Sequence, residues 1–158
     1  MRTTHRVTSA FKQKTARDCA AIYGLIAKLQ PFTPEELRRL SLPIRVSFES
    51  LKKGAGTYSD YQDLADAINV SMVRAEEIDP LAEAMVLRAR DAMVRVVQRF
   101  ECTGVWVFDG PAIGEVAEAL DFYDQLLEMS SPQQMHDALM EVKKRCEWIR
   151  AEKAKAQA

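Results

Sequence analysis

Residues 79–104 read DPLAEAMVLRARDAMVRVVQRFECTG, and this stretch decides the fold class. Asp79 and Pro80 are typical of a helix start, because a carboxylate can cap the first free amides and proline fits the first turn. Gly104 is typical of a helix end. The apolar residues between them recur at intervals of three and four, which predicts a helix. Because apolar residues nearly surround its axis, we expect this helix to be the central and most buried one.

Similar signals for helix starts and helix ends occur along the rest of the chain. A hydroxyl or carboxylate followed by proline marks three more helix starts, at Thr33-Pro34, Asp109-Gly110-Pro111 and Ser131-Pro132. A further helix is expected to start near Pro43 and to end at Lys52-Lys53-Gly54.

Helical stripes of apolar residues extend the pattern to two other segments. One stripe runs from Cys19 to Leu29 and the other from Tyr61 to Met72. The run from Val105 to Phe108 is β-like but too short to form a sheet alone. The sequence therefore predicts an all-α fold, a single bundle of about six helices with a short extended aromatic connector from Val105 to Phe108. Residues 1–8 are interpreted as a basic N-terminal arm and residues 9–158 as the helical bundle domain.

Composition fits one globular domain. The 158 residues are 47% hydrophobic and 28% charged. The three cysteines are far apart in sequence and form no CxxC pair, so neither a disulfide framework nor a zinc cluster is predicted. No apolar run is long enough to cross a bilayer, and the first residues lack the apolar core of a secretion signal. We expect a cytoplasmic protein.

Charge is segregated along the chain although the net charge is only −1. Residues 1–55 carry +7, residues 56–141 carry −12 and residues 142–158 carry +4. Such asymmetry can drive self-association or contact with a polyanion.

Residues that could carry chemistry are sparse. Lys52, Lys53 and the following glycine turn are a candidate anion site, although the order differs from a P-loop and a helix end explains the pattern more simply. The acidic rows on two helices lack the histidine that usually joins helical metal sites. His5 and His136 lie near no pattern typical of a catalytic relay. We therefore predict no enzyme activity, no metal and no cofactor.

The last helix carries the strongest signal for a partner. Met135, Leu139, Val142, Cys146 and Ile149 follow a 4-3-4-3 spacing, which predicts a narrow two-helix seam. Met140 and Trp148 lie off that seam, where they form either a second buried side or an exposed contact patch. We favour contact with a partner, such as a second copy of the chain. Trp106 and Phe108 are further candidates if the connector is exposed, with core packing as the alternative.

A second set of candidates is basic. Arg2, Arg6, Lys12, Lys14 and Arg17 precede the first acid, and Lys143, Lys144 and Arg145 cluster in the last helix. Both groups could contact phosphates of a nucleic acid. A solubilising arm, or an arm that docks on the protein's own acidic face, is the alternative for the first group.

The stretch from Leu42 to about Leu139 resembles uncharacterised small helical proteins of proteobacterial prophages and mobile elements, especially Burkholderia-like genomes. Some of those proteins carry a label as Fis-like regulators. The resemblance rests on six segments: Leu42 to Val46, Gly54 to Thr57, Leu64 to Val70, Thr103 to Trp106, Phe108 to Pro111, and Ala119 to Leu127. It implies a phage or mobile-element setting and supplies no catalytic residues.

Together these patterns favour a non-enzymatic helical interaction or regulatory protein of phage or mobile-element origin. We expect it to be a homo-oligomer that binds a host or phage macromolecule, with inhibition of a host defence as one use. Two alternatives stay open at this point: a DNA-associated regulator that uses the basic arm, and a protein that binds or sequesters a small ligand such as a nucleotide.

Overall fold

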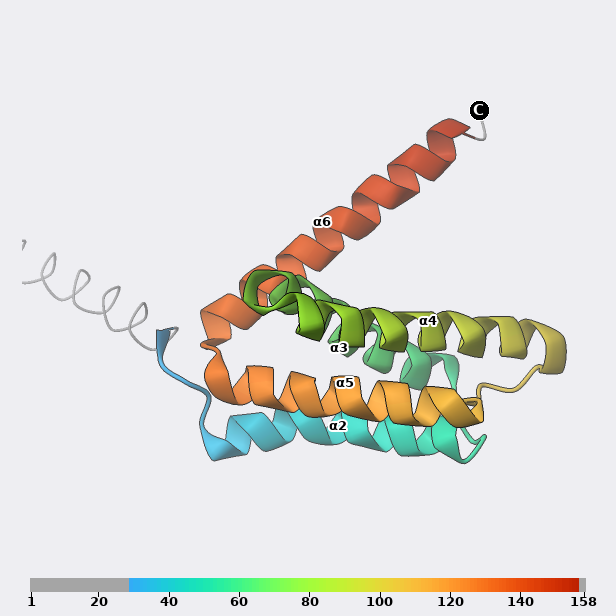
Figure 1. Ribbon diagram of the computed structural model, residues 1–158, viewed down its shortest axis with the longest axis horizontal. Coiled ribbons are helices and arrows are strands. Elements are labelled where there is room, and N and C mark those ends of the chain that lie inside the picture. Colours follow the sequence, from blue (N-terminus) through green and yellow to red (C-terminus); the bar gives the residue numbers. More distant parts are fainter. Residues whose placement is uncertain (1–28, 157–158) are drawn as a thin grey trace, which may run out of the picture.

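The computed structural model describes residues 29–156, and the described residues form five helices (Figure 1). The helices are α2 (Pro34–Lys52), α3 (Tyr58–Ile78), α4 (Pro80–Thr103), α5 (Gly110–Met129) and α6 (Pro132–Ala156). The predicted all-α class is confirmed, with five helices in place of about six. The arm of residues 1–8, and all of the predicted stripe from Cys19 to Leu29 except its last residue, lie outside the described residues.

The four helix starts that were predicted from a capping residue and a proline are confirmed. Thr33 accepts a hydrogen bond from the Glu36 amide, and the Glu36 carboxylate accepts one from the Thr33 amide, which completes a capping box. Ser131 and Gln134 make the corresponding pair of hydrogen bonds before α6. Asp79 caps α4 by accepting from the Leu81 amide. These local hydrogen bonds fix where each helix begins.

The prediction of a helix start near Pro43 is wrong, because Pro43 lies inside α2, which is continuous from Pro34 to Lys52. A proline inside a helix removes one backbone hydrogen bond and crowds the preceding turn, at a cost of about 3 kcal/mol. Packing on both sides of Pro43 offsets that cost. Leu37 packs against one apolar cluster, while Phe48 and Leu51 are buried in the other.

The central helix is α3 and not α4, which corrects the sequence prediction. Eight α3 residues are buried against five in α4, and α3 contacts every other described helix. On α4, Leu81 is 78% exposed and Val94 is 53% exposed. The apolar residues spread around α4 therefore mark surface as well as core.

Two apolar clusters hold the bundle together, and α3 contributes to both. The larger cluster joins α2, α3, α4 and α5 around side chains such as Leu64, Ile68 and Leu120. The smaller cluster joins the far part of α3 to the end of α5 and the first three turns of α6, through Val70, Leu127 and Met135 among others. The second cluster is what attaches α6 to the bundle.

The extended connector from Val105 to Phe108 is confirmed between α4 and α5. Trp106 forms an isolated antiparallel bridge with Gly56, so the connector pairs with the turn between α2 and α3. The Phe108 ring is only 4% exposed and packs 5.4 Å from the Phe48 ring. The Trp106 ring stacks on the Phe100 ring, with 4.1 Å between the ring centroids. The connector thus closes one end of the bundle with aromatic side chains.

Gly56 is required by close approach at this end of the bundle, and replacing it with alanine is expected to destabilise the fold. A Cβ there would lie 2.7 Å from the buried Leu51 Cδ1 and 3.0 Å from the Trp106 carbonyl oxygen. We expect a loss of about 1–3 kcal/mol in the free energy of unfolding, the usual cost of overpacking.

Gly114→Ala is the matched control for Gly56→Ala in urea unfolding. Gly114 lies in α5 with open space where a Cβ would stand. We expect that variant to gain about 0.5–1 kcal/mol, because alanine favours a helix over glycine. Equal effects of the two substitutions would contradict the packing described at Gly56.

Candidate functional site

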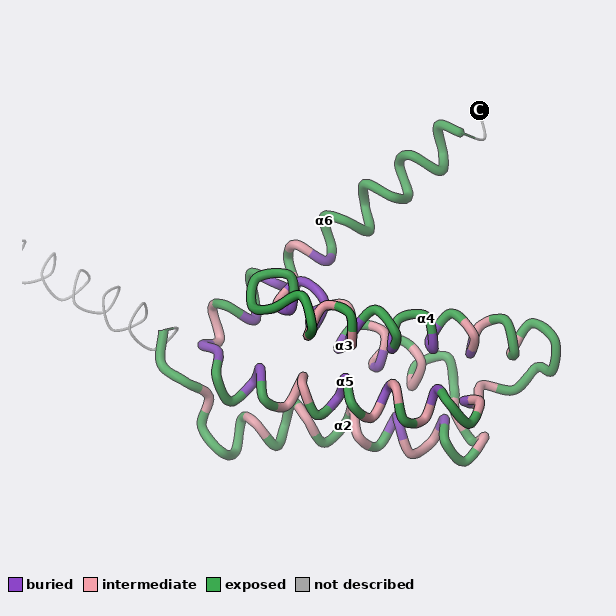
Figure 2. The backbone as a smooth tube through the Cα atoms, in the orientation of Figure 1, coloured by how far each residue is buried: buried purple, intermediate pink, exposed green. Residues whose placement is uncertain are grey.

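Helix α6 begins on the bundle and then extends beyond it. Val142 is its last buried residue, and every described residue after it, from Lys143 to Ala156, is exposed (Figure 2). We call residues 143–156 the distal half of α6. Isolated helices shorter than about 12–15 residues are marginal in water, so a 14-residue projection of this kind is typical of an element that gains stability from a partner.

The predicted seam divides at the point where α6 leaves the bundle. Met135 and Val142 are buried in the smaller apolar cluster and Leu139 packs against it, whereas Cys146 and Ile149 continue the same face into solvent. Off the seam, Trp148 is 65% exposed and Met140 is 48% exposed, as predicted. The distal half therefore presents a large aromatic and an aliphatic side chain with no core beneath them.

The distal half is also basic. It carries six Lys or Arg residues against Glu147 and Glu152, a net charge of +4. Lys143 and Lys144 lie next to the bundle and are exposed, and so is Arg145, which follows them. The distal half thus combines an exposed tryptophan with a positive field.

Arg145 anchors α6 where it crosses α3. Its guanidinium donates two hydrogen bonds to the Glu76 carboxylate, each 2.8 Å long, and its Nε donates to Glu141 at 3.0 Å. These bonds lower the pKa of Glu76 and raise that of Arg145. Around them α3 and α6 enclose an open charged groove of about 620 Å³. Arg145, which was one of the predicted contacts to nucleic acid, is therefore largely engaged in ion pairs within the chain.

The Glu76 to Arg145 contact should weaken at acidic pH. Hydrogen bonds from Arg145 lower the pKa of Glu76 from its ordinary 4.5. A carboxyl whose pKa is lower in the folded chain stabilises the fold above its unfolded pKa, and that contribution is lost as the pH falls through the folded pKa. We expect a coupling below about 1 kcal/mol at neutral pH, since both groups are partly exposed, and none at low pH.

A double-mutant cycle with Glu76→Gln and Arg145→Gln, followed by thermal melting across the pH range, measures this coupling. A coupling of the same size at neutral pH and far below pH 4.5, where the Glu76 carboxylate is protonated, would show that the ion pair does not hold α6.

Sequence analysis missed an acidic surface beside the root of α6. Residues 76–83, which we call the α3–α4 corner, carry four carboxylates and no Lys or Arg. Ile78 is 46% exposed and Leu81 is 78% exposed, and none of the eight residues is buried. The sequence signal was a group of four acids within eight residues with no Lys or Arg among them. It was overlooked because Leu81 fitted the helical stripe that was assigned to the core. The corner lies next to the point where α6 leaves the bundle (Figure 1).

The other predicted site residues have structural partners. Phe108 is buried, so it belongs to the core and offers no contact surface, while Trp106 is half-buried in an aromatic cluster. Lys52 and Lys53 both pair with Glu49, at 3.2 and 3.8 Å, and Gly54 ends α2 in a left-handed conformation. The candidate anion turn is thus a helix end. Five basic candidates lie outside the described residues: Arg2, Arg6, Lys12, Lys14 and Arg17.

Several acidic residues of α3 and α5 that were considered as metal ligands instead cap a helix or form hydrogen bonds between helices. Asp60 completes a capping box with Thr57. Asp124 accepts from Ser41 at 2.6 Å and shares Arg45 with Asp121, so these carboxylates join α5 to α2. Within residues 29–156 no group of three or more His, Cys, Asp or Glu residues is arranged to hold a metal ion.

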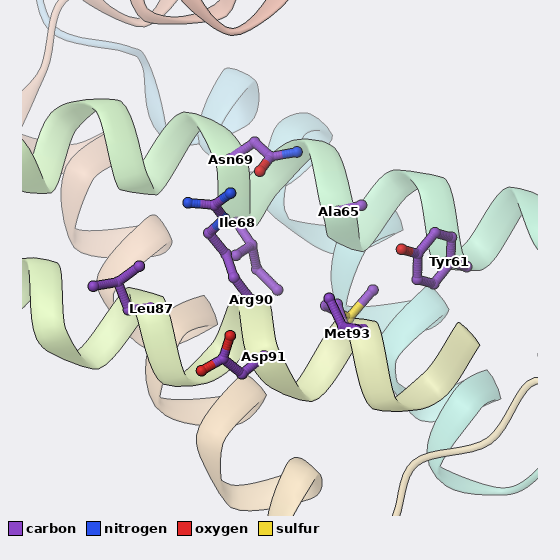
Figure 3. Close-up of a pocket in the computed structure, with 9 residues that line it drawn as sticks. Tyr61, Ala65, Ile68, Asn69, Leu87, Arg90, Asp91 and Met93 are labelled. Carbon is purple, nitrogen blue, oxygen red and sulfur yellow. The ribbon is translucent and has the colours of Figure 1, made fainter. Parts of the chain in front are cut away.

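A shallow groove lies between α3 and α4, away from α6 (Figure 3). It has a volume of about 320 Å³, and Tyr61 and Asn69 of α3 line one side. Arg90 reaches from α4 toward α3, whereas the Asp91 carboxylate points a different way. These polar groups do not converge on one point, so the groove provides no nucleophile paired with a base.

The described residues thus define a helical bundle with a projecting C-terminal helix as its one long unpartnered element. None of the described helices combines the length and the apolar character needed to cross a membrane. No family model, curated protein or solved structure matches the chain.

Proposed function

We propose that the chain is a non-enzymatic interaction protein that binds a partner protein through the distal half of α6. The observation that carries this proposal is Trp148, which is 65% exposed on a helix that continues for four turns past its last buried residue. Tryptophan and arginine are the residues that most often dominate binding energy at protein interfaces. Ile149, the next residue, adds apolar area on the adjoining face of the same helix.

The charge of the distal half specifies the kind of partner. Its net charge of +4 favours an acidic surface, which would speed association and fix orientation. A prophage or mobile-element setting, which the resemblance implies, stays part of the proposal. In that setting the protein would bind a host or phage component, and inhibition of a host defence is one use of such binding.

Trp148→Ala tests the proposal, with Met129→Ala as a matched control on an equally exposed residue of α5. The wild-type chain and both variants are immobilised, and proteins from host lysate that bind the wild type are identified and then titrated individually. We expect Trp148→Ala to weaken binding at least ~30-fold, as for an interface residue worth about 2 kcal/mol or more. We expect Met129→Ala to bind like the wild type. Undiminished binding by Trp148→Ala would refute the assignment.

Duplex DNA is the second candidate partner, because the distal half of α6 carries six cations and all of its residues are exposed. A helix of this width fits the major groove. This alternative predicts an affinity that falls steeply with salt and a smaller salt slope for Lys143→Gln/Lys144→Gln. Fluorescence anisotropy with labelled duplex measures both, and no binding at low salt would remove the alternative.

A further inference from the structure

We propose that the protein partner of the distal half of α6 is a second copy of this chain. In this dimer the distal half of each copy lies on the α3–α4 corner of the other copy. The inference rests on the proposed function, because it uses the same helix, and it deepens that function by naming the partner and the surface that receives the helix.

The two surfaces are complementary in charge and in apolar character. The distal half carries +4, and the corner carries four carboxylates, of which Glu76 pairs with Arg145 and Glu77 with Arg74 within the chain. Each also exposes two large apolar side chains, Trp148 and Ile149 on the helix and Ile78 and Leu81 on the corner. Buried together, these four side chains would leave water while the charges around them would lie opposite their counterparts.

The chain satisfies this complementarity only in part. Arg145 is the point at which α6 still reaches the corner, through Glu76. Beyond it α6 stays a continuous helix to Ala156 and runs away from the bundle (Figure 1). A rigid helix cannot fold back, so the remaining cations and Trp148 are carried away from the acidic residues that match them.

A two-fold dimer resolves this separation. In a contact with two-fold symmetry, surface i of one copy meets surface j of the other, and surface j of the first meets surface i of the second. Such a contact needs two complementary surfaces close together on one side of the chain. The corner and the distal half meet that condition because they adjoin at Arg145 and Glu76. Pairing of the two distal halves with each other would instead bring +4 against +4.

Charge reversal on each surface gives the test. The first variant, Glu77→Lys/Glu83→Lys, brings the net charge of the corner from −4 to 0, and the second, Arg150→Glu/Lys153→Glu, brings that of the distal half from +4 to 0. All four residues lie outside the core, and circular dichroism checks the fold. Light scattering on the full chain is expected to give twice the mass of one chain for the wild type and the mass of one chain for each variant alone. Mixing the two variants is expected to restore the double mass, because one contact of the mixed pair joins wild-type surfaces of +4 and −4, and the other joins the substituted positions, which again carry opposite signs.

Several outcomes would overturn the dimer. A wild-type chain that is monomeric at every concentration does so, and so does a corner-reversed variant that still dimerises, which would indicate pairing between the two α6 helices. If the corner-reversed variant does not fold, Glu77→Gln/Glu83→Gln replaces it and is expected to raise the dissociation constant. A monomeric chain whose lysate partner still depends on Trp148, or one that binds only duplex DNA, overturns this inference but not the role of α6. A monomer with no Trp148-dependent partner removes both.

Discussion

Replacing Leu64 with alanine is expected to lower the free energy of unfolding by about 3–4 kcal/mol. Leu64 is fully buried at the start of the central helix α3, within the larger apolar cluster. Truncation removes its transfer free energy and leaves a cavity that the surrounding helices cannot fill completely. Urea unfolding monitored by circular dichroism measures the change.

Leu81→Ala is the control for this substitution, since Leu81 is the same residue type and is 78% exposed on α4. At protein concentrations at which the chain is monomeric, we expect it to change stability by no more than about 0.5 kcal/mol. The contrast tests which of the two helices is central. A larger loss for Leu81 than for Leu64 would restore the sequence prediction that placed α4 at the centre.

Phe108→Ala is expected to cost about 3–4 kcal/mol, because the ring is buried and packs against Phe48. A double-mutant cycle with Phe48→Ala is expected to give a coupling of about 0.5–1.5 kcal/mol for the aromatic pair. The same unfolding measurements provide both values. A small loss for Phe108→Ala would mean that the connector does not close the bundle.

Comparison with Trp148→Ala separates stability from binding. Trp148 has no core beneath it, so its truncation is expected to leave stability within about 0.5 kcal/mol of the wild type while reducing binding. Phe108→Ala is expected to show the reverse, with normal binding at temperatures where it is folded. A variant of Phe108 that is stable but fails to bind would return the connector to the list of contact surfaces.

Local features of the fold were predictable because their physics is local. The capping hydrogen bonds of Thr33 and Ser131 involve residues three positions apart, so the sequence contains all the information needed. The left-handed helix ends at Gly54 and Gly104 were predictable for the same reason. Pro43 misled the prediction, because its tolerance inside α2 depends on packing from distant residues.

Burial and exposure were harder to predict because they depend on which elements are neighbours. The apolar spacing of α4 fits a buried helix, yet only the packed structure reveals that Leu81 and Val94 face solvent. On α6 the seam keeps its spacing from Met135 to Ile149, but the bundle beneath it ends at Val142. The sequence located Met140 and Trp148 as off-seam residues and could not show that the acidic corner lies beside Arg145, where α6 leaves the bundle.

The most direct measurement of the central claim uses the fluorescence of Trp148. The chain has two tryptophans, so Trp106→Phe leaves Trp148 as the sole indole and keeps an aromatic ring against Phe100. The account predicts that raising the protein concentration shifts its emission to shorter wavelength and protects it from acrylamide quenching, as a second copy covers it. At a concentration too low for self-association, addition of the corner-reversed chain, Glu77→Lys/Glu83→Lys, should not produce this protection. An indole that remains fully quenchable at every concentration and with every partner captured from lysate would contradict the claim that the distal half of α6 is a binding surface.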